Sequence, residues 1–166
     1  MLNYFLLNIQ SKPHLYFSEE YQMFLNFHYQ IGANLTPYRT EWTVFDEELK
    51  LSGSIDMIFE KSDKTLLIYD WKRSKAIKKT NMYECATAEC INHLPNANFW
   101  HYSLQLNTYK MILERNYNKT VSGMFLVILH PNQDTWQRIT VPDLHDEMQD
   151  LIALRLKGLP PPGGNF

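Results

Sequence analysis

The stretch LLIYDWKRSK, residues 66–75, decides how the chain is interpreted. It opens with four apolar or aromatic residues, as expected of a strand buried in a sheet. The run then ends abruptly at Asp70, and the next five positions include Lys72, Arg73 and Lys75. Alternate side chains of a strand share one face, so we expect Asp70 and Lys72 to be neighbours. The alternative is a solvated ion pair at an ordinary strand end.

The composition is typical of one globular domain. The chain has 166 residues, 45% of them hydrophobic and 14% aromatic, which allows a sizeable core. The net charge of -2 gives no overall attraction to nucleic acid, although a local basic patch can still bind phosphates. Cys85 and Cys90 lack the number and spacing of a zinc or iron–sulfur site, which favours reduced thiols in an intracellular protein.

The two ends of the chain carry further expectations. The first twelve residues, MLNYFLLNIQSK, lack the basic start and cleavage site of a secretion signal, and no run is long enough to span a bilayer. We therefore expect a soluble protein of the cytoplasm or nucleus, with no membrane contact. Residues 1–158 are predicted to form a single domain, and the Pro/Gly-rich residues 159–166 a flexible tail.

The order of elements predicts a mixed α/β fold. Residues 18–29 combine a serine, two acids and an apolar side, as a capped helix does. Residues 41–72 are typical of three antiparallel strands with short polar turns. A long helix is expected at 99–117, strands at 121–130 and 136–141, and a helix within 142–159 with Asp143 as N-cap. The result is a sheet of about five strands flanked by helices.

Asp56 lies in the strand that precedes the strand of Asp70. Its side chain is expected on one face of that strand, and those of Ile55, Met57 and Phe59 on the other face. An antiparallel hairpin would bring the carboxylate of Asp56 beside that of Asp70. Two adjacent carboxylates repel each other, and a divalent cation is the natural compensation. Mg²⁺ binds one or two carboxylates and leaves positions for water and phosphate. With Lys72 beside them, these residues match metal-assisted phosphodiester hydrolysis.

The acid of GSID, the acid and lysine of YDWK and the later QLNTY, in that order, resemble the motifs of the PD-(D/E)XK nuclease superfamily. They most resemble its RecB-like exonuclease branch, which includes the CRISPR-associated RecB-like exonucleases and the mitochondrial genome maintenance exonuclease. The resemblance covers residues 41–109, and the later elements are compatible with it. It implies a restriction-endonuclease-like fold, in which a mixed central sheet is flanked by helices.

The resemblance implies a role for each matching residue. Asp56 and Asp70 would be metal ligands, joined by the backbone carbonyl of Trp71, and Lys72 would be the catalytic lysine. Two further residues of the motif, four apart on a helix face, would support the site or touch DNA; they are Gln105 and Tyr109. A variable upstream acid of the family corresponds to Glu41, and its upstream metal-binding histidine has as candidates only His14 and His28.

The basic run KRSKAIKK, which includes Arg73 and Lys75, is placed to hold a nucleic-acid backbone next to the predicted metal. Nearby aromatic residues would stack on single-stranded bases or belong to the core; they are Trp71, Tyr83, Phe99 and Trp100. The predicted function is an Mg²⁺- or Mn²⁺-dependent DNA nuclease, exonuclease-like, working in DNA repair or recombination beside a helicase or within a larger polypeptide. The alternatives are a non-catalytic DNA-binding or scaffold module and a viral-type RNA endonuclease.

Overall fold

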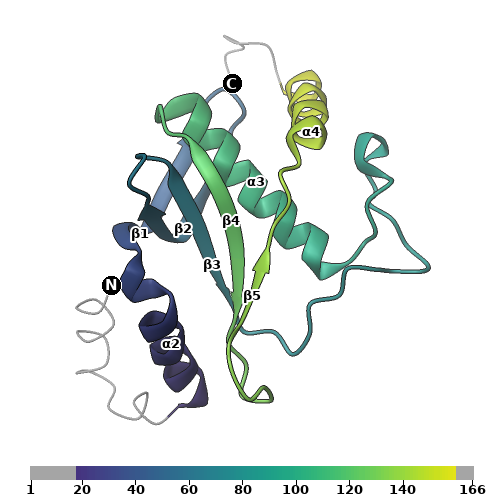
Figure 1. Cartoon of the computed structure of the whole chain (residues 1–166). Helices are drawn as coiled ribbons and strands as arrows, with labels where there is room; N and C mark the ends of the chain where they lie inside the picture. Colours follow the sequence, from purple (N-terminus) through teal and green to yellow (C-terminus); the bar gives the residue numbers. More distant parts are fainter. Residues whose placement is uncertain (1–17, 160–166) are drawn as a thin grey trace.

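The computed structural model describes residues 18–159, which form a five-stranded sheet flanked by helices (Figure 1). His14 and all but the first residue of the predicted tail, 159–166, lie outside these residues. In chain order the elements are α2 (Glu19–Gln30), η2 (Gly32–Asn34), β1 (Thr36–Asp46), β2 (Leu51–Glu60), β3 (Leu66–Lys72), η3 (Glu89–Ile91), α3 (Asn98–Asn116), β4 (Val121–Ile128), β5 (Gln137–Thr140) and α4 (His145–Gly158). No helix within this range is long and apolar enough to cross a membrane.

The sheet has the strand order β1-β2-β3-β4-β5 and is mixed. β3 and β4 are parallel, and the other three pairs are antiparallel. The parallel pair needs a long crossover, and α3 with the segment before it supplies this connection. The predicted mixed α/β sheet flanked by helices is therefore confirmed.

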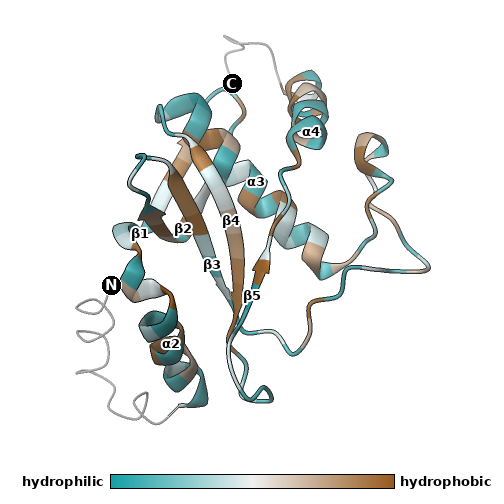
Figure 2. Cartoon of the chain, viewed as in Figure 1, coloured by the Kyte–Doolittle hydropathy of each residue, from teal (hydrophilic) through white to brown (hydrophobic). Residues whose placement is uncertain are grey.

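The two long helices near the sheet cover opposite faces of it. One cluster packs α3 onto the sheet through residues such as Leu106, Ile112 and Ile68. The other cluster packs Phe27 of α2 onto the opposite face, where it meets residues such as Tyr69. Figure 2 shows hydrophobic residues concentrated along the central strands, as burial on both faces requires.

The helix starts differ in how they are capped. The Ser18 hydroxyl accepts a hydrogen bond from the Tyr21 N–H at 3.2 Å, so the predicted serine cap of α2 is confirmed. The predicted cap of α4 is wrong, because Leu144 occupies the N-cap position. The carboxylate of Asp143 instead forms an ion pair with Lys110 of α3 at 3.3 Å, so it is used between helices.

The alternation of side chains along β2 changes at Asp56. Ile55 and Ile58 both belong to the cluster that faces α3, whereas Met57 belongs to the cluster that faces α2. The prediction that Ile55 shares a face with Met57 is therefore wrong. Across the sheet, the register pairs Thr40 with Met57 and Trp42 with Ile55, so Glu41 and Asp56 lie between these pairs; Glu41 has a left-handed backbone with φ of 46°. Irregular strand positions of this kind are common beside functional sites.

Candidate active site

The pairing of β2 with β3 brings the two predicted acids together. The ladder runs to the pair Met57 and Tyr69, so Asp56 and Asp70 are the next residues on the two strands. The N–H of Trp71 donates to Oδ2 of Asp56 at 2.9 Å. The carboxylate of Asp56 thus accepts the hydrogen bond that the Trp71 N–H would otherwise donate to a backbone carbonyl of the neighbouring strand. This contact holds the Asp56 carboxylate at the end of β3.

Asp70 is a buried carboxylate with only 3% of its surface exposed. Its Oδ2 lies 2.7 Å from Nζ of Lys72, but the contact lacks hydrogen-bond geometry, and no other residue within 18–159 hydrogen-bonds this oxygen. Burial is the main reason that the pKa of Asp70 is raised to about 6. The positive charge of Lys72 lowers this pKa, and the negative charge of Asp56 raises it by a smaller amount. The carboxylate is therefore short of positive charge, although a lysine already touches it.

Lys72 is held on three sides. Besides Asp70, its ammonium donates to Oε1 of Gln105 at 3.2 Å and lies 4.5 Å from the centre of the Tyr102 ring. Gln105 in turn donates from Nε2 to the hydroxyl of Tyr109 at 2.9 Å. The structure thus brings Gln105 and Tyr109 of α3 into contact with the acid–lysine pair of β3, and their catalytic or DNA-contacting role stays a prediction.

Two residues that support the site were missed by the sequence analysis. Tyr102 lies three residues before Gln105, so helical spacing alone would have placed it on the same face. Gly53 is the other, because a Cβ atom there would lie 2.4 Å from Cε1 of Tyr109. The glycine of GSID therefore makes room for the ring of Tyr109 against β2, a contact that no sequence signal reveals.

The remaining predicted residues lie at the edge of the site. Arg73 donates from Nε to Oε1 of Glu20 at 2.7 Å, which ties the end of β3 to the start of α2. This hydrogen bond is the main reason that the pKa of Glu20 is lowered. Lys75 and Glu41 are exposed. Within the described range no three His, Cys, Asp or Glu side chains cluster as metal ligands, so the role of Glu41 stays a prediction.

The chemistry of the donors fits a divalent cation. Asp56 and Asp70 each use one carboxylate oxygen in the contacts above, and from residues 18–159 no hydrogen bond reaches the second oxygen of either. Carboxylate oxygens are the ligands that Mg²⁺ and Mn²⁺ prefer. Burial raises the pKa of Asp70 despite the ion pair with Lys72, which adds a physical reason for further positive charge at this point. The ligand role of the Trp71 carbonyl stays a prediction.

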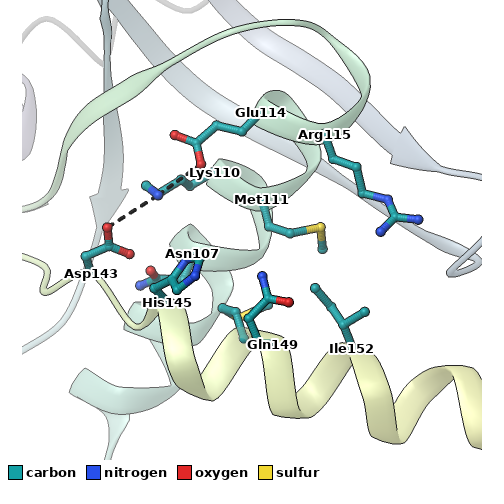
Figure 3. A pocket seen from close by; sticks show the side chains of 10 residues that line it. Asn107, Lys110, Met111, Glu114, Arg115, Asp143, His145, Gln149 and Ile152 are labelled. Carbon is teal, nitrogen blue, oxygen red and sulfur yellow. Dashed lines mark hydrogen bonds and ion pairs between the residues drawn. The ribbon is translucent and has the colours of Figure 1, made fainter.

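A separate cavity of about 310 Å³ lies between α3 and α4 and contains none of these residues (Figure 3). Its central cation, Lys110, is paired with Glu114 at 2.9 Å and with Asp143 at 3.3 Å. Burial lowers the pKa of Lys110, but the two carboxylates outweigh burial and raise it overall. The charges of the cavity thus compensate one another, and we assign it a role in joining the helices.

A model of the PD-(D/E)XK nuclease superfamily matches residues 10–159, nearly the whole chain. The chain therefore belongs to the PD-(D/E)XK nuclease superfamily, and its sheet and helices agree with the restriction-endonuclease-like fold of that family. Members are generally nucleases that use divalent metals, so the family implies a nucleic-acid substrate. No curated protein matches the chain.

Proposed function

We propose that the protein is a divalent-metal-dependent DNA nuclease of the RecB-like branch. The observation that carries the proposal is the contact set at the end of β3. There Asp70 is buried next to Asp56, and Lys72 lies 2.7 Å from the Asp70 carboxylate. In a nuclease superfamily, two adjacent carboxylates, of which Asp70 is buried, together with a neighbouring lysine can hold a divalent ion for phosphodiester hydrolysis.

Each side chain has a distinct task in this proposal. Asp56 and Asp70 would hold Mg²⁺ or Mn²⁺ through their carboxylate oxygens. Such an ion, when bound, polarises the scissile phosphate and lowers the pKa of a coordinated water. Lys72 presents a positive charge next to the acid pair, where it orients the attacking water and stabilises the negative charge that develops on the phosphate.

The positions of Gln105 and Tyr102 explain how Lys72 stays in place. A lysine side chain has several rotatable bonds, and fixing it in one position costs entropy. The hydrogen bond to Gln105 and the ring of Tyr102 restrict the ammonium before substrate arrives. The Lys72–Gln105 hydrogen bond supports the RecB-like assignment, because it links the QLNTY segment, whose Gln105 also contacts Tyr109, to the proposed catalytic lysine. We therefore propose exonuclease-like cleavage, with a helicase or a larger polypeptide as its context.

The test is cleavage of end-labelled DNA in linear and circular, single- and double-stranded forms, beside matched RNA, with Mg²⁺, Mn²⁺ or EDTA. The proposal predicts cleavage of linear DNA that EDTA stops and that circular DNA escapes. Binding of DNA by the folded protein without cleavage in any metal would support the scaffold alternative. Cleavage restricted to RNA would support the RNA endonuclease alternative.

A further inference from the structure

The segment between β3 and α3 exposes two adjacent large side chains. Met82 is 88% exposed and Tyr83 is 92% exposed. Figure 1 shows this segment, in teal, extending away from the sheet before it joins α3. Scattered exposed apolar side chains are ordinary, so the meaning of this neighbouring pair depends on what surrounds it.

Hydrogen bonds hold the tip in one conformation. The side chain of Asn81 donates to the carbonyl of Asn96 at 2.8 Å and accepts from the N–H groups of Tyr83 and Glu84, at 3.0 and 3.2 Å. The carboxylate of Glu84 accepts from Nδ2 of Asn96 at 2.9 Å. Tyr83 is therefore presented to solvent by an anchored turn.

The same segment carries several positive charges, and Lys79 lies over the Phe99 ring at 4.6 Å. Residues 71–83 contain five Lys or Arg residues and no acid. Lys72 and Arg73 have carboxylate partners. Within the described part of the chain no ion pair involves the other three, which are Lys75, Lys78 and Lys79. A row of cations without carboxylate partners is complementary to the phosphates of a nucleic acid.

The lysine run is held at the start of α3, the helix that also carries Gln105. The Lys78 N–H donates to Oδ1 of Asn98 at 2.8 Å, and the Lys78 carbonyl accepts from the N–H of Phe99 at 3.2 Å. These contacts hold the run against the start of α3. Gln105, which contacts Lys72, is about two turns or roughly 10 Å further along that helix. A strand bound on the lysines would thus lead to the candidate active site.

Tyr83 alone among the four aromatic candidates is free to stack. Trp71 packs its ring edge against Phe27 at 5.2 Å between ring centres, and Phe99 is buried. Trp100 donates from Nε1 to the carbonyl of Lys79 at 2.8 Å, so its ring holds the basic segment in place. The core alternative therefore holds for Trp71 and Phe99, while Tyr83 contacts solvent.

We propose that Tyr83 stacks on a base of single-stranded nucleic acid whose phosphates are bound by Lys75, Lys78 and Lys79. This inference rests on the proposed function and makes Tyr83 a positioning residue for the substrate. A hollow of about 610 Å³ beside the ring, lined by residues that include Lys78 and Asn96, has room for a base. Stacking uses the face of the base, which a duplex does not present, and it tolerates any sequence.

The experiment measures fluorescence anisotropy of a labelled single-stranded oligonucleotide in EDTA, so that binding is separated from cleavage. Tyr83→Ala is expected to weaken binding about 5- to 150-fold, the range for loss of one stacked base. Tyr83→Phe keeps the ring and is expected to bind like wild type. Tyr29→Ala is the matched control, because Tyr29 is 73% exposed at the opposite end of α2 from Glu20, the residue that contacts Arg73; it should leave affinity unchanged.

Two further readouts separate stacking from charge. An abasic oligonucleotide should bind wild type and Tyr83→Ala equally, because no base is present to stack. Lys78→Gln should reduce the slope of log affinity against log salt by about 0.7, as loss of one phosphate contact does. Tyr83→Ala should leave that slope unchanged.

The inference is overturned if wild type does not bind the strand or if Tyr83→Ala binds it as tightly as wild type. It is also overturned if Tyr83→Ala weakens binding of the abasic strand as much as binding of the normal strand. Failure of cleavage alone would count against the proposed function and would leave these binding results standing. Conversely, an active nuclease with an unchanged Tyr83→Ala affinity would refute only the role of Tyr83.

Discussion

Replacement of Asp70 by asparagine is expected to stabilise the protein while it removes the proposed activity. Asp70 is 3% exposed, and burial raises its pKa from the ordinary 3.8 to about 6. At neutral pH the folded protein therefore carries an ionised carboxylate in a place that favours the neutral form. Asparagine has the same shape without the charge, so Asp70→Asn relieves this unfavourable burial.

The magnitude follows from the difference between the folded and unfolded pKa of Asp70. Below about pH 4 the carboxyl is neutral in both states, and the variant gains nothing. Between about pH 4 and 6 the unfolded chain ionises first, so wild type loses about 1.4 kcal/mol of stability per pH unit relative to the variant. Above pH 6 the advantage of Asp70→Asn levels off at about 3 kcal/mol, or about 6–12 °C in melting temperature for a chain of this size.

The assay is urea denaturation of both proteins in EDTA at pH 4, 5.5 and 7.5. Asp63→Asn is a control of opposite sign, because hydrogen bonds from Thr65 lower the pKa of the exposed Asp63 carboxyl to about 2. The contribution of Asp63 is present at neutral pH and lost as pH falls toward 2, so its removal should weaken the protein at pH 7.5. A variant Asp70→Asn no more stable than wild type at pH 7.5 would refute the reasoning.

Three other outcomes are expected. Mn²⁺ at 100 times its Kd should stabilise wild type by about 2.7 kcal/mol, seen as a higher melting temperature, and should not stabilise Asp70→Asn; equal shifts would place the ion elsewhere. Lys72→Gln should lower kcat for DNA cleavage about 10²- to 10⁴-fold with folding intact, and a smaller loss would remove Lys72 from the chemistry. Gly53→Ala should cost about 1–3 kcal/mol in urea denaturation because its Cβ meets Tyr109. Gly158→Ala should be nearly neutral, because within residues 18–159 its Cβ would meet no side chain within 4 Å; equal costs would contradict the packing argument.

The part of the site that the sequence predicted depends on local regularity. The parity of β3 placed Asp70 and Lys72 on one face, and their 2.7 Å contact confirms it. The short turn after β2 implied an antiparallel hairpin, and the register confirms that Asp56 comes beside Asp70. Both inferences needed only period-two alternation and a connection too short for a parallel pair.

The part that could not be predicted depends on tertiary packing. Ile55 lies on the α3 side of the sheet because the alternation of side chains along β2 changes at Asp56. The neighbouring strand has a left-handed backbone at Glu41, and a glutamate in a sequence does not predict that conformation. Asp143 looked like a helix cap, but Lys110 of another helix competes for its carboxylate. Contacts between residues far apart in the chain decided both cases.

The most direct test of the central claim is single-turnover cleavage of labelled linear single-stranded DNA by wild type, Asp56→Asn and Asp70→Asn, each with Mn²⁺ and with EDTA. Wild type is expected to cleave only with Mn²⁺, and both variants are expected to stay folded and to bind the strand without cutting it. Cleavage by either variant at the wild-type rate, or no cleavage by folded wild type in Mn²⁺, would contradict the assignment of these two acids to a catalytic metal site.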